Sequence, residues 1–432
     1  MAKFIVRRFF LLLLTMLLVS VAVFLITEAS PGNVARNVLG AFITPEQEVS
    51  FLAQMGLDKP VYLRYLYWLA GSEWQARRLI GLPLRRITLE EGFEEWWAVD
   101  EDGALVRWKL EGDNLVALRR GPDGTVSQLN DNGRWRTDKK GISTFWGVDT
   151  HNTAVRWERG TGRKRWTFIV GTGWMESTGA PGEYIPLKKG LIRGDPGLSL
   201  RTGRPVSKSL FLRLRNSLVL AGIAFVIVMP LALLLGLMAG LKEGSVRDRT
   251  LSIGGMMFSV TPEFATGIFL ILIMAVWLKL VPGATVFGEK APWERLDMLI
   301  LPVTTLTLIE LGYVLRITRA SMVEAMKAPY IRTAFLKGLP YWRVVFKHAV
   351  RNALMAPITV IMLHVNWLLG GIVIVEVVFG YPGLGKYLLD SALYKDINAL
   401  EASAMILVTV AVGTQLVADI IYTFLNPRIR YQ

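Results

Sequence analysis

The sequence contains no cysteine and only three histidines, His151, His348 and His364, which lie far apart in the chain. Without cysteine the chain can form neither a disulfide bond nor a thiolate metal site. A transition-metal centre would need several His, Cys or carboxylate ligands at short spacings, and scattered histidines do not supply them. We therefore expect no metal site and no cofactor bound by this chain.

Charged residues are also scarce, at 19% of the 432 residues, against 52% hydrophobic residues and a mean hydropathy of +0.39. Soluble globular domains are usually less apolar. A bilayer core about 30 Å thick needs roughly 20 consecutive apolar residues in one helix. Six windows meet this condition: residues 9–27, 210–240, 253–281, 299–315, 354–378 and 402–425. The sequence thus predicts an α-helical integral membrane protein with six transmembrane helices, the first too long for a cleaved signal peptide.

The net charge of +14 would suit a nucleic-acid partner, so the position of the positive charges decides its meaning. The basic clusters are Lys3, Arg7 and Arg8 before the first window, eight Lys and Arg within residues 316–351, and Arg428 and Arg430 after the last window. All of them fall on one side of a six-span topology. The positive-inside rule therefore places them, and both termini, in the cytoplasm, and no nucleic-acid partner is expected.

This topology divides the chain into three regions. Residues 1–28 contain the first transmembrane helix, residues 29–209 form a large extracytoplasmic region, and residues 210–432 form a five-helix core with a cytoplasmic loop at about 319–354. Within the second region, short β-prone runs alternate with turn signals such as Asp102-Gly103 and Asp123-Gly124, which is typical of antiparallel hairpins. A β-rich insert is expected at about 72–186.

Tryptophan is unusually frequent in this insert. The eight residues are Trp96, Trp97, Trp108, Trp135, Trp146, Trp157, Trp166 and Trp174. Such side chains usually form a core or cross-strand pairs in a small sheet. The alternative is an aromatic surface that binds a partner protein or a ligand.

The long cytoplasmic loop has a helix–glycine–helix pattern. Residues 319–336 favour a helix, Gly338 interrupts it, and residues 342–354 can form a second short helix. Its characteristic residues are Glu324, Ala325, Tyr330, Arg332, Thr333, Ala334, Lys337, Gly338, His348, Arg351, Asn352, Ala353 and Leu354. This pattern resembles the EAA loop of bacterial ABC importer permeases, and more narrowly that of their dipeptide, oligopeptide and nickel branch.

Other segments are similar to the same branch and follow in the same order. They are residues 193–206 (with Arg193-Gly194-Asp195), residues 376–385 (Glu376-Val-Val-Phe running into Pro382-Gly-Leu-Gly385), and Asp419 with residues 426–431. The resemblance covers most of residues 1–70 and 188–432. Residues of about 72–186 are an insertion relative to ordinary members.

The resemblance implies the type I permease fold in the bacterial inner membrane, forming half of a pore with a second permease. It also implies two ATP-binding subunits, which would hold ATP and magnesium, and an extracytoplasmic solute-binding protein. In the family, a coupling helix after the loop glycine docks on the ATP-binding subunit. The corresponding residues here are Glu324, Ala325, Gly338, Leu339, Tyr341, Trp342, Arg343, Val345 and Phe346. The alternative is an amphipathic helix lying on lipid headgroups.

The segment Gly380-Tyr-Pro-Gly-Leu-Gly-Lys386 has the glycine and lysine spacing of a phosphate-binding loop. Tyr387 stands where such a loop needs Ser or Thr for magnesium, and the expected topology puts the segment outside the cell. The chain is therefore not expected to be an enzyme, and ATP hydrolysis would belong to partner subunits.

Polar groups inside apolar windows are candidates for the translocation pathway, because they are costly in a bilayer. Glu310 lies near the middle of the fourth window, and His364 and Asn366 lie in the fifth. We predict that Glu310 faces the cavity and meets a cationic part of the substrate. A hydrogen bond to a neighbouring helix is the alternative for Glu310, and helix packing for the other two.

Peptides are the expected substrate, while nickel complexes, opines and oligosaccharides stay open because the same branch carries them. A membrane-anchored sensor would need a cytoplasmic signalling domain, and no such domain follows the last window. An enzyme would need clustered His, Asp or Ser partners, and the sequence has none.

Overall fold

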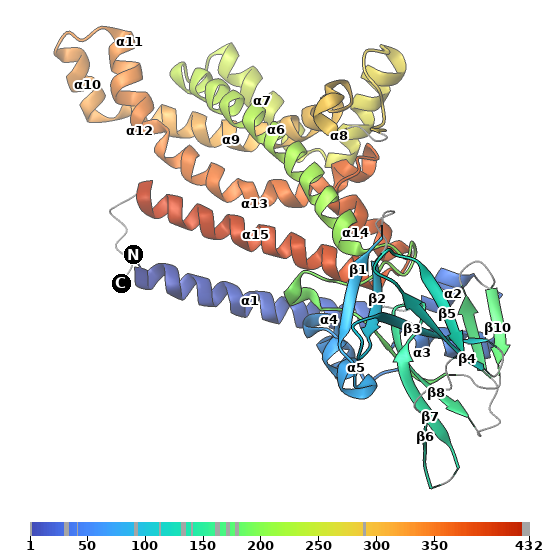
Figure 1. Ribbon diagram of the computed structural model, residues 1–432. Coiled ribbons are helices and arrows are strands. Elements are labelled where there is room, and N and C mark those ends of the chain that lie inside the picture. Colours follow the sequence, from blue (N-terminus) through green and yellow to red (C-terminus); the bar gives the residue numbers. More distant parts are fainter. Residues whose placement is uncertain are drawn as a thin grey trace. The chain divides into compact units, whose positions relative to one another are not determined.

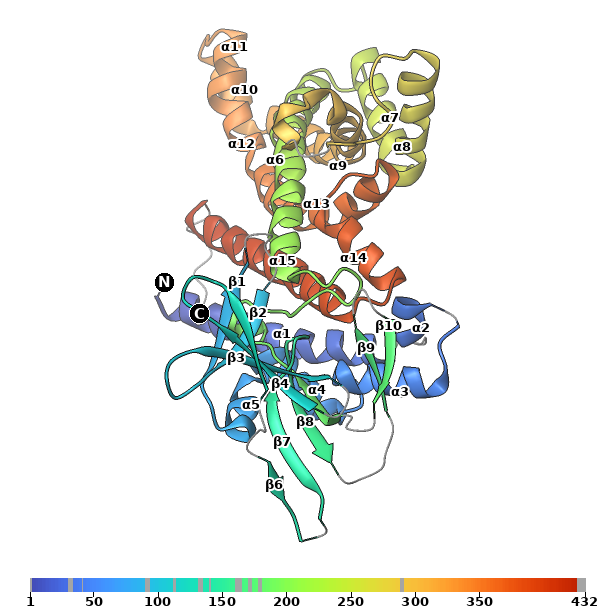
Figure 2. The same cartoon turned by 45° about the vertical axis from the view of Figure 1, so that its right-hand side comes forward.

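The computed structural model describes residues 2–29, 34–40, 42–89, 94–111, 114–130, 135–139, 141–159, 165–169, 173–177, 181–287 and 291–425 (Figures 1 and 2). They fall into two compact units. Residues 1–20, 210–390 and 403–432 belong to the first, and residues 21–209 and 391–402 to the second.

The first unit is helical. Its elements are α6 (Val206–Leu241), α7 (Val246–Val260), α8 (Glu263–Leu270), the π-helix η2 (Ile271–Trp277), the 3-10 turns η3 (Pro292–Glu294) and η4 (Leu296–Met298), α9 (Ile300–Lys327), α10 (Pro329–Leu336), α11 (Tyr341–Val344), the π-helix η5 (Val345–Val350), α12 (Arg351–Ala353), α13 (Met355–Val378) and α14 (Leu384–Leu393). The long helices α1 (Ala2–Ala29) and α15 (Ile397–Leu425) contribute to both units, as do the start of α6 and the end of α14.

Four helices are long and apolar enough to cross a membrane, and bent helix pairs raise the number to at most six in the described part of the chain. The prediction of one continuous span at residues 253–281 is wrong, because α7 and the α8–η2 pair meet at an angle of 107°. Pro262 lacks an N–H, and the preceding Thr261 adopts an extended conformation (φ −74°, ψ 131°), which ends α7. A second pair, Tyr341–Ala353 and Met355–Ile361, bends by 41°.

Helix α9 packs closely against α6 and α7 through glycines. A Cβ atom on Gly240 would lie 2.6 Å from the Cβ atom of Met322, and one on Gly236 would lie 2.5 Å from that of Thr318. A Cβ atom on Gly312 would lie 2.0 Å from the carbonyl oxygen of Gly255. Small residues thus let the helix backbones approach, as expected for glycines in membrane helices.

The second unit combines short helices with strands. The helices are α2 (Val34–Leu39), α3 (Pro45–Gln54), α4 (Val61–Ala70), α5 (Glu73–Ile80) and the 3-10 turn η1 (Leu191–Arg193). The strands are β1 (Leu84–Thr88), β2 (Glu94–Val99), β3 (Leu105–Glu111), β4 (Asn114–Arg120), β5 (Val126–Asn130), β6 (Arg136–Thr137), β7 (Ser143–Val148), β8 (Thr153–Arg159), β9 (Arg165–Ile169), β10 (Gly173–Ser177) and β11 (Pro181–Pro186). They form antiparallel sheets with the orders β1-β2-β3-β4-β5, β11-β8-β7-β6 and β10-β9.

Trp96, Trp108 and Trp157 belong to the hydrophobic core of this unit, and Trp135 and Trp146 pack against it. The core interpretation is therefore confirmed for these five tryptophans. Trp96, Trp97, Trp108 and Trp157 are buried, and Trp135, Trp146, Trp166 and Trp174 are half-buried. Phe145 lies between two of them, with its ring centroid 5.4 Å from that of Trp108 and 5.8 Å from that of Trp157. Aromatic contacts of this kind add about 0.5–1.5 kcal/mol each beyond the burial of area.

The hairpins β2–β3 and β7–β8 repeat one another in sequence. Residues 97–108 and 146–157 align without a gap, and six of the twelve positions are identical. The identical pairs are Trp97/Trp146, Val99/Val148, Asp100/Asp149, Val106/Val155, Arg107/Arg156 and Trp108/Trp157. Both turns also contain a residue with positive φ at the same position, Gly103 at 78° and Asn152 at 61°. The β-region therefore contains two copies of one hairpin.

The two ends of the β-region meet. The N–H of Ser72 donates to the carbonyl oxygen of Lys188 at 3.0 Å, and Gly71 and Gly190 have φ of 91° and 92°. A Cβ atom on Gly71 would lie 2.4 Å from the carbonyl oxygen of Lys189, and one on Gly190 would lie 2.3 Å from the nitrogen of Gly71. Only glycine fits at either position, because both the backbone angle and the space require it.

Candidate coupling site and pathway residues

The predicted helix over residues 319–336 is interrupted in the structure. Helix α9 ends at Lys327, Ala328 is extended (φ −67°, ψ 142°), and α10 begins at Pro329. The proline disfavours a helical conformation at the residue before it and is well suited to the first helical position. The turn after α10 contains Gly338 with φ of 74°, and no atom lies within 4 Å of where its Cβ would be. Backbone conformation alone therefore requires glycine here.

The helices after Gly338 have one buried and one exposed side. Val344 and Val345 are at most 1% exposed, in a cluster with Ile331, Ala334 and Ala325. Leu339 packs against this cluster, whereas Glu324 and Arg343 are exposed. Of the predicted coupling residues, Val345 and Ala325 are thus buried in the cluster on which the segment packs.

Exposed aromatic side chains line the other side. Tyr341 is 42%, Trp342 61% and Phe346 66% exposed. Ring centroids lie 6.2 Å apart between Phe335 and Tyr341, 5.3 Å between Tyr341 and Trp342, and 5.7 Å between Trp342 and Phe346. We call Phe335, Tyr341, Trp342 and Phe346 the aromatic ladder. Its residues come from α10, α11 and the start of η5, and α10 and α11 form a hairpin beyond the end of α9 (Figures 1 and 2).

Two ion pairs fasten the α6–α7 turn to the half of α9 that leads into this hairpin. Arg319 binds the buried carboxylate of Asp248 through two nitrogens, with Nη2 2.7 Å from Oδ2. Lys327 Nζ lies 2.7 Å from Glu243 Oε2. The N–H of Gly244 also donates to Asp248 at 2.9 Å. With donors from both Arg319 and Gly244, the Asp248 carboxylate holds the start of α7 against α9.

The glycine-rich segment at residues 380–386 binds a carboxylate of its own chain. Glu376 is fully buried, and it accepts hydrogen bonds from the Ser217 hydroxyl and, at 3.0 Å, from the N–H of Lys386. The first turn of α14 thus directs an N–H at this carboxyl group. A Cβ atom on Gly383 would lie 2.0 Å from Glu376 Oε1, so glycine is needed for this approach. Sequence reasoning treated Glu376 only as part of a motif and did not foresee this role.

Glu310 is buried within the helix packing of α9, at 1% exposed. Its neighbour Ile309 accepts a hydrogen bond from Ser259 of α7 at 3.3 Å, so this turn of α9 faces α7. His364 and Asn366 lie on α13, and their side chains are outside the described part of the structure. Glu310 is thus the one predicted pathway residue whose side chain is described, and it lies on α9, outside the segment that carries the aromatic ladder.

Two protein-family models match this chain. The model of the binding-protein-dependent transport system inner membrane component matches residues 232–431, and the N-terminal model of such membrane components matches residues 1–79. Residues 80–231 lie outside the two matches.

Two relatives align with this chain over similar lengths. The oligopeptide transport system permease protein AppB of Bacillus subtilis is 33% identical over 253 residues, covering 58% of this chain and 80% of that protein. The dipeptide transport system permease protein DppB of Escherichia coli K12 is 30% identical over 275 residues, covering 58% of this chain and 81% of that protein. The chain therefore belongs to the family of binding-protein-dependent transport system inner membrane components, in the branch of ABC importer permeases that includes AppB and DppB.

Proposed function

We propose that this chain is the permease half of an ATP-driven peptide importer, and that the aromatic ladder is its docking surface for an ATP-binding subunit. The proposal rests on residues 341–346, which have one buried and one exposed side. Val344 and Val345 fix the segment in the core, while Trp342 and Phe346 remain 61% and 66% exposed at its tip. Exposed aromatic anchors of this kind dominate protein interfaces.

We also propose a membrane topology for the chain. The basic residues 316–351 and both termini lie in the cytoplasm, which requires an even number of spans. Six spans, with each bent helix pair counted as one, meet this condition and place the β-rich insert of about 72–186 outside. Such a chain pairs with a second permease and receives solute from a solute-binding protein. Peptides are proposed as the solute because AppB and DppB carry oligopeptide and dipeptide transport in their names.

Glu310, His364 and Asn366 remain proposed pathway residues. A buried carboxylate within a membrane helix is costly unless it has a function or a partner. If Glu310 meets a cationic group of the solute, Glu310→Gln should reduce uptake of cationic peptides more than uptake of neutral ones. Equal uptake of both by this variant would favour a purely structural role.

Affinity purification of the tagged chain from mild detergent, followed by mass spectrometry and an ATPase assay, tests the proposal. We expect a second permease, ATP-binding subunits and a solute-binding protein to co-purify. Trp342→Glu together with Phe346→Glu should remove the ATP-binding subunits but retain the second permease.

Trp293→Glu is the matched control, since Trp293 is also half-exposed, at 50%, and precedes α9 at its other end. Retention of the ATP-binding subunits by the double variant would refute the docking surface. A binding protein that takes nickel complexes, opines or oligosaccharides would replace the peptide assignment.

A further inference from the structure

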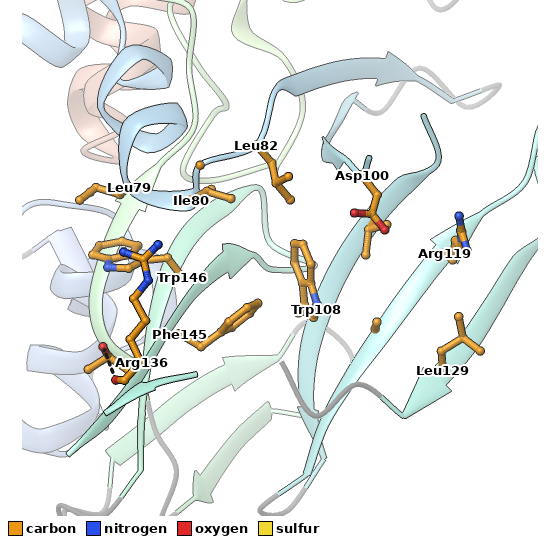
Figure 3. Close-up of a pocket in the computed structure, with 14 residues that line it drawn as sticks. Leu79, Ile80, Leu82, Asp100, Trp108, Arg119, Leu129, Arg136, Phe145 and Trp146 are labelled. Atoms are coloured by element: carbon orange, nitrogen blue, oxygen red, sulfur yellow. Dashed lines mark hydrogen bonds between the residues drawn. The ribbon is translucent and has the colours of Figure 1, made fainter. Parts of the chain in front are cut away.

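The second unit contains a pocket that the proposed transport function does not use. It has a volume of about 570 Å³ and lies between the five-stranded sheet, the β6–β7 hairpin and the end of α5. Pockets that hold small ligands have volumes of about 300–1,000 Å³. Figure 3 shows Arg136 and Trp146 at one end of the pocket, Trp108 in the middle, and Asp100 with Arg119 at the other end.

The strand register places the groups at this second end on one face of the sheet. Ala98 of β2 pairs with Val106 of β3, and Val106 pairs with Arg119 of β4. Side chains two residues apart in a strand point to the same side, so Trp108 shares this face, and Asp100 continues it just beyond β2. An acidic, a basic and several apolar side chains therefore line one surface.

The guanidinium group of Arg119 reaches the turn that Asp100 begins. Its Nη2 atom lies 3.1 Å from Oδ2 of Asp102, and the carbonyl oxygen of Asp100 accepts a hydrogen bond from Gly103 in the same turn at 2.9 Å. The side chain of Asp102 is 76% exposed, and such exposed ion pairs contribute little. Since a guanidinium group has five N–H donors, Arg119 keeps donors for a ligand carboxylate.

The second copy of the hairpin shows what Asp100 lacks. Its counterpart Asp149 has a cation of its own, because Nδ1 of His151 lies 3.5 Å from the Asp149 carboxylate. At the position of His151 the first copy has Asp102, which is acidic. The half-buried Asp100 accepts a hydrogen bond from the N–H of Glu101 at 2.9 Å, but in the described ranges no cationic side chain forms an ion pair with it. Asp100 is therefore available to a cationic group of a ligand.

The middle of the pocket is apolar and aromatic. Val106, Trp108 and Phe145 line it and are at most 8% exposed. The rings of Trp108 and Phe145 meet edge to face, with their centroids 5.4 Å apart and their planes at 70°. A ligand side chain that enters here leaves water and meets aromatic surface, which favours a large apolar or aromatic group.

We propose that this pocket binds a free α-amino acid with a large apolar side chain. Its ammonium group would bind Asp100, its carboxylate would bind Arg119, and its side chain would lie against Trp108 and Phe145. An α-amino acid carries both charges on one carbon, which suits two opposite charges at one turn. Arg136, at the other end of the pocket, takes no part in holding this head group.

The test uses the full-length chain in lipid nanodiscs without partner subunits. The probe is tritiated L-phenylalanine, and its equilibrium binding is competed by phenylalanine amide, which lacks the carboxylate, and by N-acetylphenylalanine, which lacks the ammonium group. We expect L-phenylalanine to bind, and each analogue to bind at least about tenfold more weakly, because each loses a charge-assisted hydrogen bond. This comparison does not depend on the folding of any variant.

Two variants assign the charges to residues. Asp100→Asn should abolish the preference for L-phenylalanine over the N-acetyl analogue but keep the preference over the amide, and Arg119→Gln should do the reverse. Arg85→Gln is the matched control, because Arg85 is exposed and stands opposite Trp97, on the other face of the same sheet from Arg119. It should bind all three compounds like the unmodified chain.

Three results would overturn the proposed amino-acid site: no binding of L-phenylalanine, equally strong binding of either analogue, or unchanged preferences in either variant. None of them bears on the docking of ATP-binding subunits, since that is measured on the aromatic ladder by co-purification.

Discussion

Gly338 illustrates how one residue can set the direction of a functional segment. Its φ of 74° lies in a region that costs other residues about 1–2 kcal/mol, and its surroundings are empty. Any effect of a substitution therefore acts through the backbone of the turn that carries the aromatic ladder, and steric contact contributes nothing.

We predict that Gly338→Val lowers the number of solute molecules transported per ATP hydrolysed, because valine shifts the turn and with it Tyr341 and Trp342. Gly338→Asn should behave almost like the original chain, since asparagine tolerates positive φ. The measurement is the ratio of uptake to ATP hydrolysis in proteoliposomes that contain the complete importer. Normal coupling in the valine variant would remove Gly338 from the mechanism.

His151 gives the β-region a dependence on pH. Burial alone would lower the pKa of His151, but the hydrogen bond and the negative charge of Asp149 outweigh it, so the pKa is raised above its usual value. The Nδ1 atom of His151 lies 3.5 Å from Asp149 Oδ2. Since the folded state binds the proton more tightly, protonation stabilises the fold at low pH, and this contribution is lost as pH rises through the raised pKa.

We therefore expect the β7–β8 turn to open more readily at about pH 8 than at about pH 6, given the usual histidine pKa of about 6.5. Hydrogen exchange of residues 150–155, corrected for intrinsic rates, measures this opening. Asp149→Asn keeps an oxygen acceptor for the N–H groups of His151 and Thr153 but removes the charge. A pH dependence as large in this variant as in the original chain would exclude the ion pair as its cause.

Among the secondary-structure elements of the first unit, α9 packs against α7, α8 and α13. Its glycine at position 312 lies against Gly255 of α7, and the atom that a new Cβ would meet is a backbone oxygen 2.0 Å away. Backbone atoms cannot move aside as a flexible side chain can, so the helices themselves would have to separate.

We predict that Gly312→Ala destabilises the chain by at least the 1–3 kcal/mol typical of overpacking. Gly254→Ala is the control, because it lies on α7 one residue before Gly255 and has no atom within 4 Å of the new Cβ. Thermal unfolding in detergent compares the two variants. Equal unfolding temperatures for both would show that α7 and α9 do not pack as closely as described.

Several of these elements could be predicted from sequence. The strands around Asp102-Gly103 and Asp123-Gly124 lie where the turn signals indicated, because hairpin turns depend on local chemistry. The break at Pro262 is also local, but a long apolar window obscures it. The hydrogen bonds of the Glu376 side chain could not be predicted. One comes from the N–H of Lys386 in the first turn of α14, and the other from Ser217, which is distant in sequence. The repeat of residues 97–108 at residues 146–157 is visible when the two segments are aligned, but patterns of hydrophobicity do not show it.

At the scale of the whole molecule, the β-region shares one core with α3 and α4, and its two ends meet at Gly71 and Gly190. Trp96, Trp108 and Trp157 are all buried within that region. Tyr67 of α4 belongs to the same core, and Ala53 and Leu63 pack against it, whereas the helices of the first unit have separate core clusters. Removal of the region should therefore disturb α3 and α4 but leave the core of the first unit in place.

We expect a chain without residues 72–186 to reach the membrane and to retain its ATP-binding subunits, because Leu187, Lys188 and Lys189 suffice to join the two glycines. Docking of the solute-binding protein should weaken, since the insert is proposed to lie on that side of the membrane. Co-purification measures both. Loss of the ATP-binding subunits, with the chain otherwise properly inserted, would contradict the independence of the two regions.

The junction at Gly71 and Gly190 also bears on how such a protein arises and how it can be engineered. Because the chain leaves and returns at neighbouring points, a single in-frame event in the gene can add or remove the entire module without lengthening the connection between its flanking segments. The same two glycines therefore mark a natural grafting point. A circularly permuted fluorescent protein joined there would report, through its emission, on strain at the base of the module during the transport cycle.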